Sequence, residues 1–188
     1  MKTNKKTATP DVIAEAGFAV LSRNPGANLA EIAAAAGVTR ATLHRYFPSR
    51  QNLIGELARR ALQEMEDAVA LACADARSAG DGLRRSMAAL IPLGDRHGFL
   101  AHEQFEHDES IEQSFASIQS ETARWIDAAK GEGEFDPHIP TEWISRAYDY
   151  LLYAAWDSIR LEETTPSQAA VLAWRTLTSG LGESDERR

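Results

Sequence analysis

The sequence predicts an all-α protein, and three observations lead to this prediction. Hydrophobic residues make up 44% of the 188-residue chain, with Ala and Leu prominent among them. The strand-favouring residues Val, Ile and Thr rarely occur in clusters. Apolar residues recur at spacings of three and four, and glycines and prolines divide this pattern into about nine helices.

The first three predicted helices are short and closely spaced. Thr9-Pro10-Asp11 supplies a cap, a proline suited to the first helical position and an acid in the first turn. Asn28 and Glu31 form a capping-box pair, and Gly37 ends the helix that they begin. Thr39 can cap the next helix. The predicted spans are residues 10–23, 29–36 and about 40–47.

A long helix and several shorter ones should follow. Ser49 can cap the long helix, whose apolar positions extend at helical spacing to about Ser78. Gly80, Gly82 and Gly94 then act as expected helix breakers. Further helices are predicted near residues 83–91, 95–106, 109–130 and 141–162, and a last one near 166–179. The tail from 183 to 188 is charged.

Charge is distributed unevenly along the chain. The formal net charge is −8. Residues 1–60 nevertheless contain nine Lys and Arg against four Asp and Glu, whereas residues 61–188 contain 11 against 24. Because electrostatic steering depends on where charge lies, the basic N-terminal part remains suited to nucleic acid.

The segment from Leu29 to Phe47 has the pattern of a helix-turn-helix. Two short helices must cross at a steep angle through a short turn, and Gly37 permits that reversal of the backbone. Val38 can fill the angle between the helices, and the small side chain of Ala33 lets them approach closely. The side chains expected in the shared core are Ile32, Leu43 and Phe47.

The remaining side chains of this segment form a polar and basic outward surface that can hydrogen-bond to phosphates and base edges. An alternative is that Gly-Val-Thr merely joins two surface helices of a helical scaffold or small-molecule-binding protein without DNA function. That alternative does not explain the basic N-terminal part. The candidate DNA-binding residues are Thr39, Arg40, Thr42, His44, Arg45, Tyr46 and Arg50.

The stretch Leu43-His-Arg-Tyr-Phe-Pro-Ser-Arg-Gln-Asn-Leu53 resembles the signature of the TetR (tetracycline-repressor) family. In that family an aromatic doublet ends the third helix and a basic residue begins the fourth. The resemblance covers about residues 10 to 60. Two positions depart from the usual pattern, since His44 stands where Tyr is commonest and Arg50 where Lys is commonest. Arg50 keeps the positive charge expected to contact phosphate.

The resemblance implies an N-terminal helix-turn-helix DNA-binding domain over residues 1–50. A long helix would join it to a helical ligand-binding and dimerisation domain over 51–182, followed by the tail. A sequence-specific regulator, usually a repressor released from its operator by a small-molecule effector, is the implied function. The family places its ligand cavity among aromatic residues that correspond to Phe105, Trp125, Tyr153 and Trp156. The acidic excess favours a neutral or cationic effector.

Dimerisation is expected through the last two helices. Apolar residues line one face of each, which suits a four-helix interface between two copies. Such a homodimer would bind pseudo-palindromic operator DNA with half-sites about 34 to 36 Å apart. The expected interface residues are Trp143, Ala147, Tyr150, Leu151, Ala154, Ser158, Val171, Leu172 and Trp174.

Other kinds of site find little support in the sequence. His97, His102 and His107 are five residues apart, so they do not share a helix face as metal ligands would. No nucleophile elbow, Walker glycine loop or His-Glu-x-x-His motif indicates an enzyme, and nothing indicates a cofactor. The single Cys73 predicts a quiet buried thiol. The longest apolar run, Tyr150–Trp156, is too short to span a membrane, so we expect a cytoplasmic protein.

Overall fold

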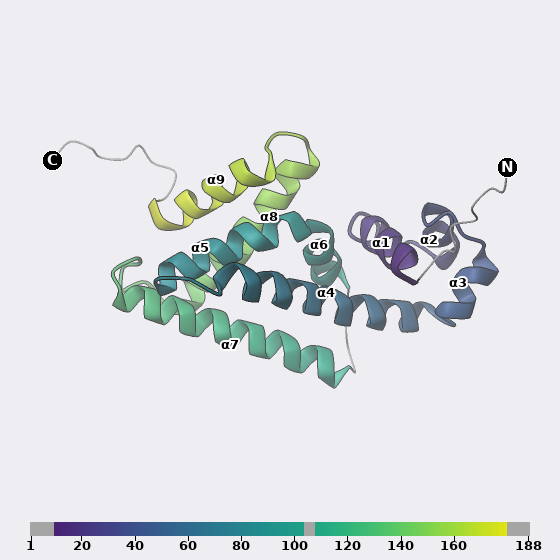
Figure 1. Cartoon of the computed structure of the whole chain (residues 1–188), viewed down its shortest axis with the longest axis horizontal. Helices are drawn as coiled ribbons and strands as arrows, with labels where there is room; N and C mark the ends of the chain where they lie inside the picture. The colour runs from purple at the N-terminus through teal and green to yellow at the C-terminus, as the bar shows by residue number, and fades with distance from the viewer. Residues whose placement is uncertain (1–9, 104–107, 180–188) are drawn as a thin grey trace. The chain divides into compact units, whose positions relative to one another are not determined.

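The computed structural model describes residues 10–103 and 108–179, and the regular elements within these residues are all helices (Figure 1). They are α1 (Pro10–Leu21), α2 (Leu29–Ala35), α3 (Arg40–Tyr46), α4 (Arg50–Cys73), α5 (Ala79–Leu90), the short 3-10 helix η1 (Ile91–Leu93), α6 (Gly94–His102), α7 (Glu109–Gly131), α8 (Thr141–Arg160) and α9 (Pro166–Ser179). The predicted all-α class is confirmed.

The chain forms two compact units. The first contains residues up to Gln63 together with Asp95–Ile111, and the second contains Glu64–Gly94 and the residues from Glu112 onward. The helix-turn-helix unit therefore includes α6, which lies about 50 residues further along the sequence than α3. Helices α4 and α7 each contribute residues to both units.

The core of the first unit forms where α1 packs against α4 and α6. Gly17 lies so close to α4 that an added Cβ would be 2.8 Å from a methyl group of Leu57. Phe18 and Phe99 meet edge to face with their ring centres 5.6 Å apart. The buried face of α1 is shifted from the expected one, because Val12 is 38% exposed. The buried residues of α1 are Ile13, Ala14, Gly17, Phe18 and Leu21.

Polar contacts add to this attachment of α6. The guanidinium of Arg96 pairs with Glu15 at 2.5 Å and lies over the ring of Phe18 at 4.6 Å. The hydroxyl of Ser22 donates to the carboxylate of Asp95 at 3.3 Å. Because α1 carries Glu15 and Phe18, these contacts attach α6 to the first helix of the helix-turn-helix unit.

The core of the second unit forms among α5, α7, α8 and α9, and α8 packs against α9. The phenol of Tyr148 is buried in this core, where it donates to the Leu83 carbonyl at 3.2 Å and lies 2.5 Å from the Ser86 hydroxyl. These bonds satisfy a polar group that would otherwise be costly to bury. Residues at the centre of this core include Leu83, Met87, Ile91, Ile126, Phe135, Ile144 and Leu152.

Two predicted boundaries around α5 were wrong. Helix α4 ends at Cys73 instead of Ser78, because the Ser78 side chain accepts the Asp81 N–H at 3.0 Å and so begins the next helix. Gly82 lies inside α5, where a Cβ would be 1.7 Å from the indole of Trp125. The glycine therefore makes room for a ring and does not break the helix.

The helix break expected at Gly94 is present, because α5 ends at Leu90, η1 follows and α6 begins at Gly94. An added Cβ there would be 1.5 Å from the indole of Trp156. The segment predicted at 95–106 is helical to His102, and residues 104–107 lie outside the described residues, as does the tail at 183–188. None of the described helices has the length and apolar character needed to cross a bilayer.

Candidate DNA-binding surface and effector pocket

The turn between α2 and α3 is fixed by local contacts. The Asn28 side chain accepts the N–H groups of Ala30 and Glu31 at 2.8 and 3.2 Å, and the Glu31 carboxylate accepts the Asn28 N–H at 2.7 Å. The predicted capping box is therefore present. Gly37 has a φ of 66°, a left-handed conformation that glycine adopts without strain. The Thr39 hydroxyl accepts the Thr42 N–H at 3.1 Å and begins α3.

Buried side chains hold α3 against α2. Ile32 and Leu43 are fully buried, and Phe47 is 6% exposed. The predicted core of the motif is thereby confirmed. Because Leu43 and Phe47 face inward, the polar residues between them must face outward.

The outward face of α3 is polar and basic. Thr39, Arg40, His44 and Arg45 are exposed, and Thr42 is half-buried. The Thr39 and Thr42 hydroxyls lie 2.9 Å apart. Guanidinium and hydroxyl groups on this face can both donate hydrogen bonds to DNA.

Arg45 and Tyr46 lie against each other at the end of α3. The guanidinium of Arg45 lies 5.0 Å from the centre of the Tyr46 ring and donates to its hydroxyl at 3.3 Å. Tyr46 is half-buried and Arg45 is exposed. The two side chains therefore lie together at the C-terminal end of the exposed face of α3.

Arg50 is placed differently from the other candidates. Its Nη2 atom donates to the Pro25 carbonyl and to the Glu103 carboxylate, the latter at 3.0 Å. Its Nη1 atom is buried and has no hydrogen-bond partner among the described residues. Sequence reasoning missed Glu103, because this partner lies 53 residues away along the chain.

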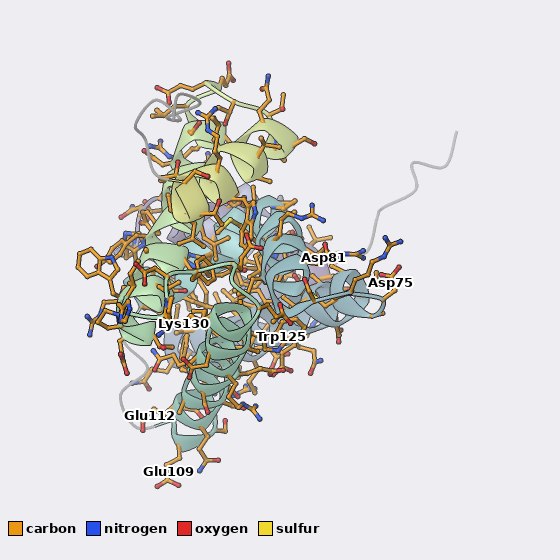
Figure 2. The ribbon with its side chains drawn as sticks, turned by 90° about the vertical axis from the view of Figure 1, so that its left-hand side faces the viewer. Asp75, Asp81, Glu109, Glu112, Trp125 and Lys130 are labelled. Atoms are coloured by element: carbon orange, nitrogen blue, oxygen red, sulfur yellow. The ribbon has the colours of Figure 1, made fainter. Side chains whose placement is uncertain are left out.

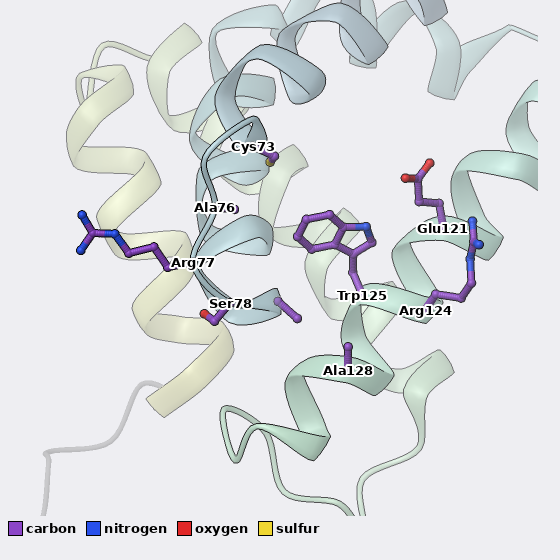
Figure 3. A pocket seen from close by; sticks show the side chains of 9 residues that line it. Cys73, Ala76, Arg77, Ser78, Glu121, Arg124, Trp125 and Ala128 are labelled. Carbon is purple, nitrogen blue, oxygen red and sulfur yellow. The ribbon is translucent and has the colours of Figure 1, made fainter.

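A pocket of about 480 Å³ opens in the second unit where the ends of α4 and α5 meet α7. Figure 3 shows the Trp125 ring in its middle, directed toward the segment that carries Cys73 and Ala76. Glu121 and Arg124 lie on α7 before Trp125, toward the N-terminal end of the helix. The Arg77 side chain points away from the indole (Figure 3). In Figure 2 Trp125 lies on the side of α7 that faces the corner carrying Asp75 and Asp81.

Of the three expected ligand-binding residues that the structure describes, Trp125 lines this pocket, whereas Tyr153 and Trp156 do not. Tyr153 and Trp156 instead pack edge to face on each other, with ring centres 5.6 Å apart, and Trp156 is 9% exposed. Phe105 lies outside the described residues. Cys73 was expected to be fully buried, but it is half-buried in the pocket wall. Its thiol donates to the Gly82 carbonyl at 3.3 Å, and burial raises its pKa.

The described histidines His97 and His102 do not form part of a metal-binding group. Among the described residues no group of three or more His, Cys, Asp and Glu side chains is close enough to hold a metal ion. The His102 Nδ1 atom lies 2.6 Å from the Gly98 carbonyl of its own helix. His107 lies outside the described residues.

Helices α8 and α9 expose large apolar side chains. Trp143 and Tyr150 on α8 are 65% and 75% exposed, and Val171 and Leu172 on α9 are 67% and 44% exposed. Trp174, expected on the same face, is half-buried and packs edge to face on Phe135 at 6.2 Å. The two helices thus present an apolar surface to solvent in the single chain.

Helix α3 is short and has an exposed basic face, and the left-handed Gly37 sets it across the capped helix α2. This arrangement is that of a helix-turn-helix DNA-binding protein. Residues 7–57 match the family model described as "Bacterial regulatory proteins, tetR family". Over these residues the chain is similar to the TetR family of regulatory proteins, whose helix-turn-helix binds DNA.

Relatives extend this similarity over nearly the whole chain. The HTH-type transcriptional repressor LfrR of Mycolicibacterium smegmatis is 28% identical over 182 residues, which cover 96% of this chain and 94% of the relative. The crystal structure of LfrR in complex with proflavine is similar with a TM-score of 0.75 at 26% identity, covering 97% of this chain and all of that one. AibR, solved with isovaleryl coenzyme A and operator DNA, shares the fold, with a TM-score of 0.75 at 16% identity over 90% of this chain and 97% of its own.

Proposed function

We propose that this protein is a homodimeric repressor that binds a pseudo-palindromic operator and leaves it when a small molecule binds. The observation that carries the proposal is the exposed polar and basic face of α3, bounded by the buried Leu43 and Phe47. Its candidate readers are Arg40, Thr42 and His44, with Thr39, Arg45 and Tyr46 beside them. Because a repressor must reach its operator DNA, we propose that the protein acts in the cytoplasm.

Two substitutions separate reading from positioning. Arg40→Ala removes an exposed guanidinium from α3 and should flatten the preference for operator over random DNA by about 1 to 3 kcal/mol. Arg50→Ala should weaken binding to all sequences and reduce the dependence on salt, because a lost phosphate contact releases fewer counterions. Fluorescence anisotropy on the protein's own upstream region and on random DNA, at several salt concentrations, measures both effects.

The opposite pattern would contradict these roles. If Arg50→Ala changed sequence preference and left the salt dependence intact, Arg50 would be a reader and not a phosphate contact. If the wild-type protein bound neither the upstream region nor random DNA, a helical scaffold without DNA function would be favoured instead.

The homodimer uses the apolar surface of α8 and α9. Trp143, Tyr150 and Val171 are each more than half exposed, and a second copy of the same surface would remove them from water. Sedimentation equilibrium at micromolar concentration should give a dimer, and Tyr150→Arg should shift it toward monomer. A wild-type monomer under these conditions would contradict the proposal.

The effector occupies the Trp125 pocket and is a planar aromatic molecule, neutral or cationic. The indole offers an aromatic face, Glu121 and Arg124 bring one carboxylate and one guanidinium to the wall, and a volume near 480 Å³ suits a small ligand. The complex of LfrR with proflavine supports this class. Tyr153 and Trp156 are proposed as secondary contacts.

Proflavine is the first probe. It should raise the melting temperature of the wild-type protein, and Trp125→Ala should abolish most of the rise because the stacking face is lost. Tyr153→Ala changes a proposed secondary contact that does not line the pocket wall, so it should reduce the rise less than Trp125→Ala does. An equal rise in the wild-type protein and Trp125→Ala would place the ligand elsewhere.

A further inference from the structure

The contacts of Arg50 point to a role for Glu103. Arg50 is the first residue of α4 and lies three residues after Phe47 in the sequence, so it belongs to the part of the chain that faces DNA in the proposed function. Its side chain is only 36% exposed and that of Glu103 only 14%. The Arg50 guanidinium, which is proposed to contact phosphate, is therefore largely removed from solvent and paired with the Glu103 carboxylate.

In this arrangement few N–H donors of the Arg50 guanidinium are free to bind DNA. Arginine binds phosphate best through two parallel N–H donors. Here Nη2 is shared by the Pro25 carbonyl and Glu103, and Nη1 is buried. To present two donors to a phosphate, the guanidinium must turn away from Glu103.

Glu103 suits the role of a competitor. A carboxylate presents two acceptor oxygens, as a phosphate does. Burial raises the pKa of Glu103, while Arg50 and His102 lower it, so the guanidinium favours the ionised carboxylate. Among the described residues the salt bridge from Glu103 is to Arg50.

We propose that Glu103 is an intramolecular phosphate mimic that withholds Arg50 from DNA, and that DNA binding requires Arg50 to exchange this carboxylate for a backbone phosphate. The proposal rests on the proposed function, because it takes Arg50 as a phosphate contact. Glu103 itself is a positioning residue and touches no DNA. The stronger the salt bridge between Glu103 and Arg50, the less the Arg50 contact with phosphate adds to the affinity for DNA.

The test measures binding to a labelled duplex of arbitrary sequence, about 40 base pairs long, since phosphate contacts do not depend on sequence. Glu103→Gln should bind about three- to tenfold more tightly than the wild-type protein, because Arg50 is released. Glu103→Asp keeps the negative charge but shortens the side chain, and it should also tighten binding. Glu15→Gln is the matched control, since it removes one carboxylate from the Arg96 pair of the same unit.

The result is decided by comparison with Arg50→Ala. In an Arg50→Ala background, Glu103→Gln should no longer tighten binding beyond the small gain given by Glu15→Gln. Equal gains for Glu103→Gln and Glu15→Gln, or weaker binding by Glu103→Gln, would overturn the proposal. Thermal melts establish that each variant is folded, and Glu103→Asp provides the comparison if Glu103→Gln is not. Failure of the wild-type protein to bind any DNA would contradict the proposed function as well, which separates the two.

Discussion

His97 shows how one buried side chain can link stability to pH. It lies half-buried in α6, and burial lowers its pKa below the ordinary value of 6.5. The folded protein therefore keeps the ring neutral where the unfolded chain already binds a proton. Stability from this residue is complete above pH 6.5 and decreases as the pH falls below it, by at most about 1.4 kcal/mol per pH unit.

Denaturant unfolding at pH 7.5 and 5.5 measures this effect. His97→Gln should lose less stability between the two pH values than the wild-type protein, because the titrating ring is absent. His138→Gln is the control, since His138 is exposed in the loop before α8. An unchanged pH dependence in His97→Gln would contradict the assignment.

At the scale of the element, α5 and α7 approach closely because Gly82 has no side chain. A Cβ at this position would be 1.7 Å from the Trp125 ring, so Gly82→Ala must displace the indole or separate the helices. We expect a loss of about 1 to 3 kcal/mol, although alanine favours the helix more than glycine does. Gly131→Ala is the control, because an added Cβ there meets no atom within 4 Å.

Equilibrium unfolding followed by tryptophan fluorescence compares the two variants. Gly131→Ala should be neutral or slightly stabilising, and Gly82→Ala should also weaken the thermal shift with proflavine, because the proposed stacking ring has moved. Equal stability of the two variants would mean that the Trp125 ring can move away without cost.

The elements that could be predicted from the sequence are those set by local contacts. The Asn28 capping box, the Gly37 turn and the Thr39 cap involve residues within a few positions of each other, so α2 and α3 were predictable. Gly82 was misinterpreted as a helix breaker, because the small residue is needed there to make room for the indole of Trp125 on a distant helix. The sequence gives no sign of such a partner.

The candidate site divides in the same way. The exposed face of α3 followed from helical periodicity and from the buried Leu43. The partner of Arg50 did not, because Glu103 is brought to it by α6 packing on α1 and α4. Trp125 was expected only from the family resemblance, and Cys73 as a pocket residue was not foreseen.

At the scale of the whole molecule, the two compact units are joined by three crossings of the chain, after Gln63, Gly94 and Ile111. The first lies within α4 and the third within α7. The Trp125 pocket is lined by residues of these same two helices, including Cys73 at the end of α4. A ligand there contacts elements that continue into the DNA-binding unit.

This continuity predicts reciprocal coupling between effector and operator. Helix α4 has 24 residues, so it extends about 36 Å from Arg50, where DNA contact is proposed, to Cys73 in the pocket wall. If the ligand prefers the arrangement that does not bind DNA, a coupling of about 1 to 3 kcal/mol lowers operator affinity by about 5- to 150-fold. Operator DNA must then weaken ligand binding by the same factor. Titrating the ligand with and without saturating operator tests this directly, with Trp125→Ala as the control that should bind operator normally. Equal ligand affinities in the two titrations would exclude ligand-induced release, because coupling between two sites cannot act in one direction only.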